Sequence, residues 1–126
     1  MDSLQLAILL LVLFQLKHFI CDYPLQGQYM LGKSGVVNWF NPLALHSLVH
    51  AIGTFLILVW FNPLLAGILA VADLVLHFIV DRIKASPSLG GRWNPTQPYF
   101  WWALGLDQMA HHIINIGFIY VLIVYV

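Results

Sequence analysis

Residues 40–84 of the chain read FNPLALHSLVHAIGTFLILVWFNPLLAGILAVADLVLHFIVDRIK. This stretch holds two apolar runs, and each opens with an Asn-Pro pair, at Asn41-Pro42 and Asn62-Pro63. Asn favours the N-cap of a helix and Pro favours its first turn, so each pair predicts a helix start. Because the second pair follows the first run almost directly, the two helices are expected to form a tight antiparallel hairpin.

Two further apolar runs flank this hairpin, which gives four predicted helices at about residues 4–22, 42–61, 63–84 and 99–126. A helix needs roughly 20 apolar residues to cross a bilayer. The chain has 126 residues, of which 61% are hydrophobic and 8% charged, whereas about a quarter of the residues in a soluble domain are charged. We therefore predict a single all-α membrane domain over residues 1–126, a four-transmembrane-helix bundle surrounded by the lipid bilayer.

The net charge and the cysteine content exclude several classes of function. The formal net charge is zero, which gives no basic surface for nucleic acid. Cys21 is the only cysteine, which excludes an internal disulfide and a thiolate metal cluster. The first residues lack the basic start and the small-residue cleavage site of a signal peptide, so this segment is expected to remain as the first helix.

The basic residues predict the orientation of the bundle. All five fall at or in the two long connections between the predicted helices: Lys17, Lys33, Arg82, Lys84 and Arg92. The positive-inside rule places these connections in the cytoplasm and both termini on the non-cytoplasmic side, here of a bacterial inner membrane.

Ionisable residues recur four apart within each predicted helix, so each set shares one helix face. The sets are His18 with Asp22, His46 with His50, Asp73 with His77 and Asp81, and Asp107 with His111. Antiparallel threading brings all four sets to the same, cytoplasmic leaflet. A charged side chain inside a membrane costs about 2.5–3.5 kcal/mol and is usually retained for function. We therefore predict a buried metal centre.

The predicted ligands are the nine residues of these sets: His18, Asp22, His46, His50, Asp73, His77, Asp81, Asp107 and His111. Four carboxylates would balance two divalent ions, and inward-facing carboxylates and histidines hold two-metal sites in other helical bundles. Mixed nitrogen and oxygen ligands suit one or two zinc ions, with manganese, iron or nickel as alternatives. A metal-free hydrogen-bonded network of the same side chains is the competing interpretation.

The same motifs also resemble those of a known protein family. The pattern HxxxD…HxxxH…HxxxD…LDQxxH, from His18 through Leu106-Asp107-Gln108 to His111, resembles a family of small bacterial and phage membrane proteins catalogued as a domain of unknown function. This resemblance implies family membership and brings no established activity, and Asp73 does not map onto the pattern. The arrangement is more loosely similar to membrane-bound metal-dependent hydrolases, which carry His and Asp motifs on short helices.

The leading hypothesis is a metal-dependent membrane hydrolase acting on an ester, phosphoester or amide that is lipid-like or reaches the interface. Asp22 and Asp107 are the predicted catalytic residues, because the chain has no glutamate to act as a base. Substrate contacts are predicted at Gln26, Tyr29, Lys33 and Lys84.

Two other functions remain open. Intramembrane His and Asp also suit a metal-ion or proton transporter or a metal-binding sensor, and a homo-oligomer could build a path between subunits. Against transport, the first helix before Gln15 and the second from Thr54 onward are nearly all apolar. The third hypothesis is an envelope accessory protein with a structural metal.

Overall fold

The computed structural model describes residues 1–126 and contains helices without any strand. The four long helices are α1 (Ser3–Asp22), α3 (Phe40–Leu58), α4 (Pro63–Ala85) and α5 (Pro98–Tyr125). Each is long and apolar enough to cross a membrane. The short elements are α2 (Gln28–Leu31), the 3-10 turn η1 (Gly32–Ser34) and the 3-10 turn η2 (Gly90–Arg92). The fold is thus all-helical with four candidate membrane spans, as the hydropathy predicts.

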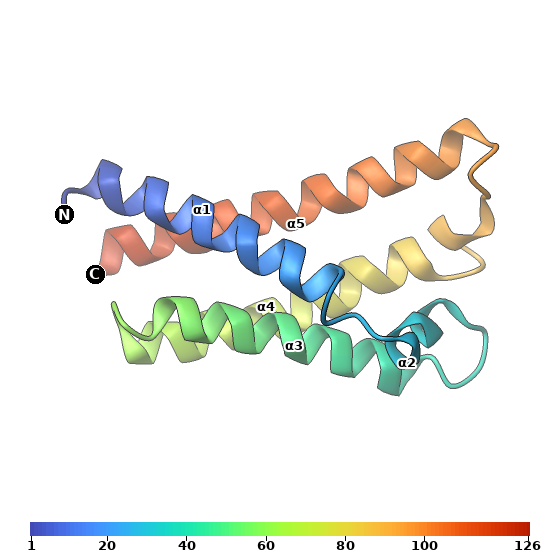
Figure 1. Ribbon diagram of the computed structural model, residues 1–126, viewed down its shortest axis with the longest axis horizontal. Helices are drawn as coiled ribbons and strands as arrows, with labels where there is room; N and C mark the ends of the chain where they lie inside the picture. The colour runs from blue at the N-terminus through green and yellow to red at the C-terminus, as the bar shows by residue number, and fades with distance from the viewer.

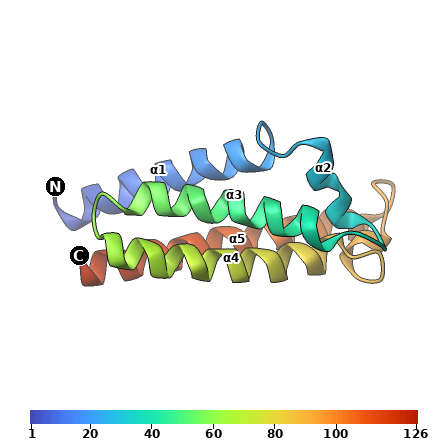
Figure 2. The same ribbon diagram turned by 90° about the horizontal axis from the view of Figure 1, so that it is seen from below.

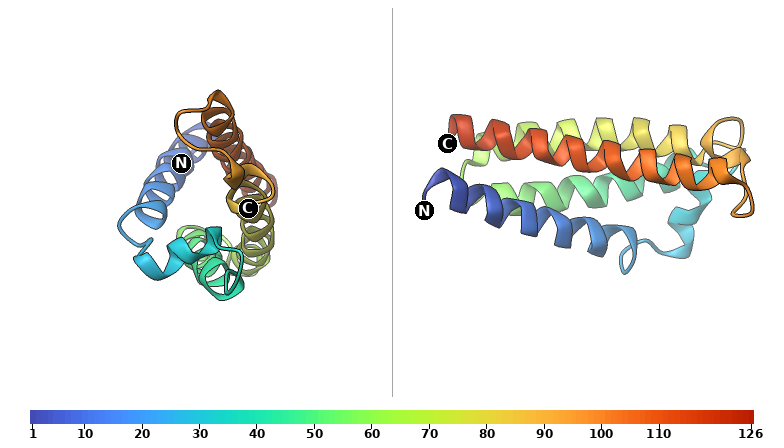
Figure 3. Two further views of the ribbon diagram at one scale, coloured as in Figure 1. Left: turned by 90° about the vertical axis from the view of Figure 1, so that its right-hand side faces the viewer. Right: turned by 90° about the horizontal axis from the view of Figure 1, so that it is seen from above.

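The four long helices run side by side and pack in a ring, in which α1 and α4 each contact both α3 and α5 (Figures 1 and 3). Both chain termini and the tight α3–α4 connection lie at one end of the bundle. The segment with α2 and the connection with η2 lie at the other end (Figure 2). This topology brings the C-terminal ends of α1 and α4 next to the N-terminal ends of α3 and α5.

The two Asn-Pro pairs start their helices differently. Asn62 is the N-cap of α4, and its side chain accepts a hydrogen bond from the Leu65 amide at 3.1 Å. The expected N-cap at Asn41 is wrong, because α3 begins at Phe40, two residues before the predicted start at Pro42, and its N-cap Trp39 makes no side-chain capping hydrogen bond. Pro42 then lies inside the first turn, where a missing amide hydrogen removes no helical hydrogen bond.

The interior of the bundle is divided along its length. At the end with the termini it is apolar, formed by Leu6, Leu10, Phe14, Leu58, Ala66, Leu69, Phe118, Ile119 and Leu122. Toward the other end the buried residues are mostly polar or charged. Large apolar side chains cover the outer faces of all four helices, as they do in proteins that contact lipid.

The α2 end of the bundle is covered by a fixed segment. The Arg82 side chain on α4 donates hydrogen bonds to the carbonyl oxygens of Lys33, at 2.8 Å, and Gly35, at 3.3 Å. Its guanidinium also lies 3.8 Å from the centre of the Trp39 ring, a cation–π distance. These contacts hold the connection between α1 and α3 over the polar half of the interior.

Candidate metal centre

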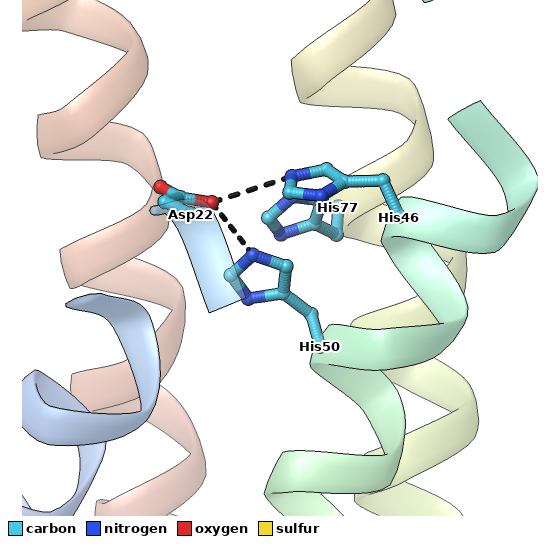
Figure 4. Close-up of side chains that lie close together, drawn as sticks. All are labelled: Asp22, His46, His50 and His77. Carbon is cyan, nitrogen blue, oxygen red and sulfur yellow. Dashed lines mark hydrogen bonds and ion pairs between the residues drawn. The ribbon is translucent and has the colours of Figure 1, made fainter. Parts of the chain in front are cut away.

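Asp22, the last residue of α1, faces His46 and His50 of α3 in the polar half of the bundle (Figure 4). Its Oδ1 atom is 2.7 Å from His50 Nε2 and 3.3 Å from His46 Nε2, both on α3. Its Oδ2 atom is 3.0 Å from His18 Nε2, one turn back on α1. A single carboxylate therefore joins imidazoles from two helices.

His77 of α4 completes a four-residue group with Asp22, His46 and His50. Its ring stacks on that of His50 with 3.9 Å between the ring centres, and Figure 4 shows the four side chains converging from α1, α3 and α4. Their ligand atoms all lie within 4.8 Å of one another. Around a tetrahedral zinc the ligand atoms stand roughly 3.3 Å apart, so modest side-chain rotations would enclose an ion.

Several nitrogen atoms in this group have no hydrogen-bond partner. His77 Nε2 and the Nδ1 atoms of His46 and His50 are buried and unpaired. The three residues expose 3% or less of their surface. An unpaired polar atom in such a place is costly unless something else satisfies it. A divalent ion bound to His77 Nε2 would give that atom a partner. The donor set of three histidines and one aspartate suits such an ion.

A second group of three residues overlaps the first. It consists of His77, Asp81 and His111, whose ligand atoms also lie within 4.8 Å of one another. The His111 ring stacks on His77 with 4.2 Å between centres. Because a neutral imidazole has one free lone pair, His77 serves one ion at a time. The two groups are therefore two overlapping positions for an ion rather than two independent sites.

The buried charges favour one divalent ion over the two expected from the sequence. Lys33 Nζ lies 2.6 Å from Asp81 Oδ2, and Lys17 Nζ lies 3.0 Å from Asp73 Oδ2. Each lysine neutralises its aspartate. Of the four carboxylates in the polar half, Asp22 and Asp107 have no lysine partner, and one divalent cation would balance their two negative charges.

Asp73 lies outside both groups, although it shares a helix face with His77. Its Oδ2 atom accepts hydrogen bonds from Lys17 at 3.0 Å and from Thr54 at 2.5 Å. It is one turn deeper in the bundle than His77, where α1, which runs in the same direction as α4, presents Lys17 rather than a histidine. The structure therefore places Asp73 in an ion pair with Lys17, outside both groups of candidate metal ligands.

The other predicted ligands border the four-residue group. His18 Nε2 lies 2.7 Å from Gln108 Oε1 as well as near Asp22. Asp107 Oδ1 lies 3.2 Å from His111 Nε2, and its Oδ2 accepts a hydrogen bond from Gln108 at 3.2 Å. Contacts of this kind orient metal ligands in other proteins. The sequence reasoning did not assign a role to Gln108, although it stands next to Asp107 in the LDQ motif.

A polar cavity of about 140 Å³ adjoins the four-residue group. It is lined by Asp22, Tyr23, Gln26, Lys33, Asp81, Lys84, Leu104, Asp107 and Gln108. Three of the four predicted substrate contacts, Gln26, Lys33 and Lys84, are among these residues. Tyr29 is not, since it points outward with 59% of its surface exposed. The candidate ligand Asp22 thus faces a space that water or a small polar group can enter.

Comparison with known proteins gives one match. The sequence profile of a family described as "Protein of unknown function (DUF3307)" matches residues 9–126. No curated protein and no solved structure matches the chain.

Proposed function

Since the chain belongs to this family of proteins of unknown function, we propose a function from its own site: a divalent-metal-dependent hydrolase within a membrane. The observation that carries the proposal is that the four-residue group opens on the polar cavity through Asp22. An ion held only for stability would be enclosed by packed protein. Here one ligand lies at the boundary between the group and a space lined by carboxylates, amides and lysines.

The chain supplies the groups that hydrolysis needs. A divalent ion held by the four-residue group would lower the pKa of a nearby water and would polarise the oxygen of the bond to be broken. Asp107 lines the cavity and is held by His111 and Gln108, so it is placed to accept the proton of the attacking water. For each ester bond broken, one water is consumed. Its oxygen joins the acyl carbon or phosphorus and keeps one hydrogen, and the other proton passes through Asp107 to the departing alcohol.

The coordination number separates this function from a structural metal. Four protein ligands complete a tetrahedral zinc and leave no position for water, which is the arrangement of structural zinc sites. An octahedral manganese, iron or nickel ion would keep two open positions. The hydrolase therefore requires a six-coordinate ion, or a zinc that expands its coordination toward the cavity.

The transport alternative is supported by one feature, the buried set of Lys17, Asp73 and Thr54. This set extends the polar interior one turn deeper than the histidines. Beyond it, however, Leu10, Phe14 and Leu58 are fully buried and close the bundle. A single chain therefore offers an ion no polar route through its second half, which favours the hydrolase.

The first test is elemental analysis of the protein purified in detergent. We expect about one divalent ion per chain in the unmodified protein, as the two carboxylates without lysine partners require. The variants His46→Gln and His50→Gln should lose most of it. His112→Gln is the matched control, because His112 lies outside both ligand groups and bonds to Gln15 at 3.2 Å. A protein that never binds an ion, or equal loss in all three variants, would refute the site.

The second test is turnover of a panel of lipid esters and phosphoesters by the metal-loaded protein. Asp107→Asn should abolish metal-dependent turnover while most of the ion is retained, since Asp107 contributes to the charge balance but lies outside both ligand groups. Full occupancy without turnover of any ester would contradict the hydrolase. Metal flux in proteoliposomes would then favour transport.

A further inference from the structure

An apolar groove of about 550 Å³ runs along the seam between α4 and α5 and ends under η2. Most of its lining is apolar, with Val80 and Ile83 on α4, and Leu106 and Ala110 on α5. Because both helices are candidate membrane spans, this groove opens toward the acyl chains of a bilayer.

Two cations lie at the η2 end of the groove. Lys84 and Arg92 both line it, and neither forms an ion pair with a carboxylate of the chain. The Arg92 guanidinium packs 4.6 Å from the centre of the Trp93 ring, which also lines the groove. Free cations and a tryptophan at one end of an apolar groove are typical of the level of lipid headgroups.

The groove communicates with the polar cavity at the metal centre. Lys84 and Asp107 line both spaces. Asp107 lies on α5 between Ala103 and Ala110, so it stands partway along the groove, between the cations and the deeper apolar part. If a molecule places its phosphate at the two cations and its chain in the groove, the part that links phosphate and chain therefore lies beside Asp107.

We propose that the groove binds an anionic phospholipid, with the phosphate at Lys84 and Arg92 and an acyl chain along Val80 and Ala110. This inference rests on the proposed function and gives it a substrate class, a lipid with a phosphate and ester bonds. The divalent ion at the metal centre would also favour phosphate binding. Without it, the uncompensated carboxylates of Asp22 and Asp107 would repel the phosphate.

The experiment uses the full-length protein in nanodiscs of phosphatidylcholine that contain a trace of spin-labelled phosphatidylglycerol or spin-labelled phosphatidylcholine. The fraction of each label immobilised by the protein gives their relative affinity. We expect a clear preference for phosphatidylglycerol. Replacing both cations, in K84Q/R92Q, should reduce this preference by about thirty-fold, from the attraction of two basic residues for anionic lipid. The charge-conserving variant K84R/R92K should keep most of it.

A second pair of variants tests the acyl part of the groove. Ala110→Phe places a ring in the groove and should reduce immobilisation of the phosphatidylglycerol label. Ile113→Phe is the control on the same helix, because Ile113 is exposed and lies outside the groove. Equal immobilisation of the two lipids by the unmodified protein would overturn the proposal. So would displacement of the label by inorganic phosphate together with no effect of Ala110→Phe, because the site would then be one for free phosphate.

Metal content and turnover measured on the same samples keep the two proposals distinct. A preference for phosphatidylglycerol without turnover would leave the lipid site standing and contradict the hydrolase. Turnover of lipid esters without any such preference, unaffected by K84Q/R92Q, would contradict the lipid site alone.

Discussion

Lys17 forms a buried ion pair with Asp73, and neighbouring residues on α3 leave space for it and hydrogen-bond to it. Its Nζ atom lies 3.0 Å from Asp73 Oδ2, and the lysine exposes 7% of its surface. Gly53 on α3 makes room for it, since a Cβ atom at Gly53 would lie 2.9 Å from Lys17 Cγ. Thr54, the next residue, donates to the same carboxylate oxygen. The pair therefore has the packing and the hydrogen bonding that a buried ion pair needs.

Breaking this pair should destabilise the protein without emptying the metal centre. Lys17→Met leaves the Asp73 charge unpaired and should cost about 3–5 kcal/mol of unfolding free energy. Adding Asp73→Asn removes that charge, keeps an acceptor for Thr54 and should recover most of the loss. Thermal unfolding in detergent measures the stability, and elemental analysis of the double variant measures the ion. Loss of the ion from the double variant would show that Asp73 is a ligand after all.

At the scale of the elements, the helices follow from local signals in the sequence. Apolar runs of sufficient length predict four spans, and the structure has four. The spacing of four also places each His and Asp set on one face, and the antiparallel order places the sets at one end. These features depend only on the geometry of a single helix and on the direction of its neighbours.

The partners of each polar residue could not be predicted in the same way. Asp73 and His77 share a helix face, yet Asp73 pairs with Lys17 whereas His77 belongs to the four-residue group. Which residue of α1 faces each of them depends on the rotation and axial shift of α1 against α4, and these are set by packing across the bundle. Lys33 reaches Asp81 from a connection whose path no periodicity describes.

The η2 turn gives a prediction at this scale. Gly91 donates a backbone hydrogen bond to the Ser86 carbonyl oxygen at 2.9 Å, and a Cβ atom there would collide with the Ala85 carbonyl oxygen. Gly91→Ala should therefore cost about 1–3 kcal/mol by overpacking. Gly105→Ala in α5 is the control, because nothing lies within 4 Å of its added Cβ. It should stabilise the helix by about 0.5–1 kcal/mol. Unfolding midpoints in detergent compare the two, and equal shifts would contradict the tight turn.

The whole molecule has its basic residues at one end, which predicts its orientation. Lys17 no longer counts toward this argument, because it is buried and neutralised by Asp73. The other four, Lys33, Arg82, Lys84 and Arg92, all lie at the α2 end of the bundle, opposite the termini. The positive-inside rule still predicts that this end, and the candidate metal centre near it, face the cytoplasm.

Labelling of single cysteines tests this orientation. In a Cys21→Ser background, Ser3→Cys places a thiol at the end with the termini and Ser34→Cys places one at the α2 end, both at exposed positions. A maleimide that cannot cross membranes should label Ser3→Cys in intact bacterial spheroplasts, and Ser34→Cys only after permeabilisation. The reverse pattern would invert the topology and turn the metal centre to the outside.

The candidate ligands of the four-residue group come from α1, α3 and α4, which are separate helices of one chain. An ion that binds only the assembled bundle adds its binding energy to assembly, by about 2.7 kcal/mol when its free concentration is a hundred times its dissociation constant. Cells starved of the ion would therefore hold a larger share of loosely associated helices, which membrane quality-control proteases remove. The steady-state abundance of this protein would then follow the metal supply of the cell even where its gene is transcribed at a constant rate.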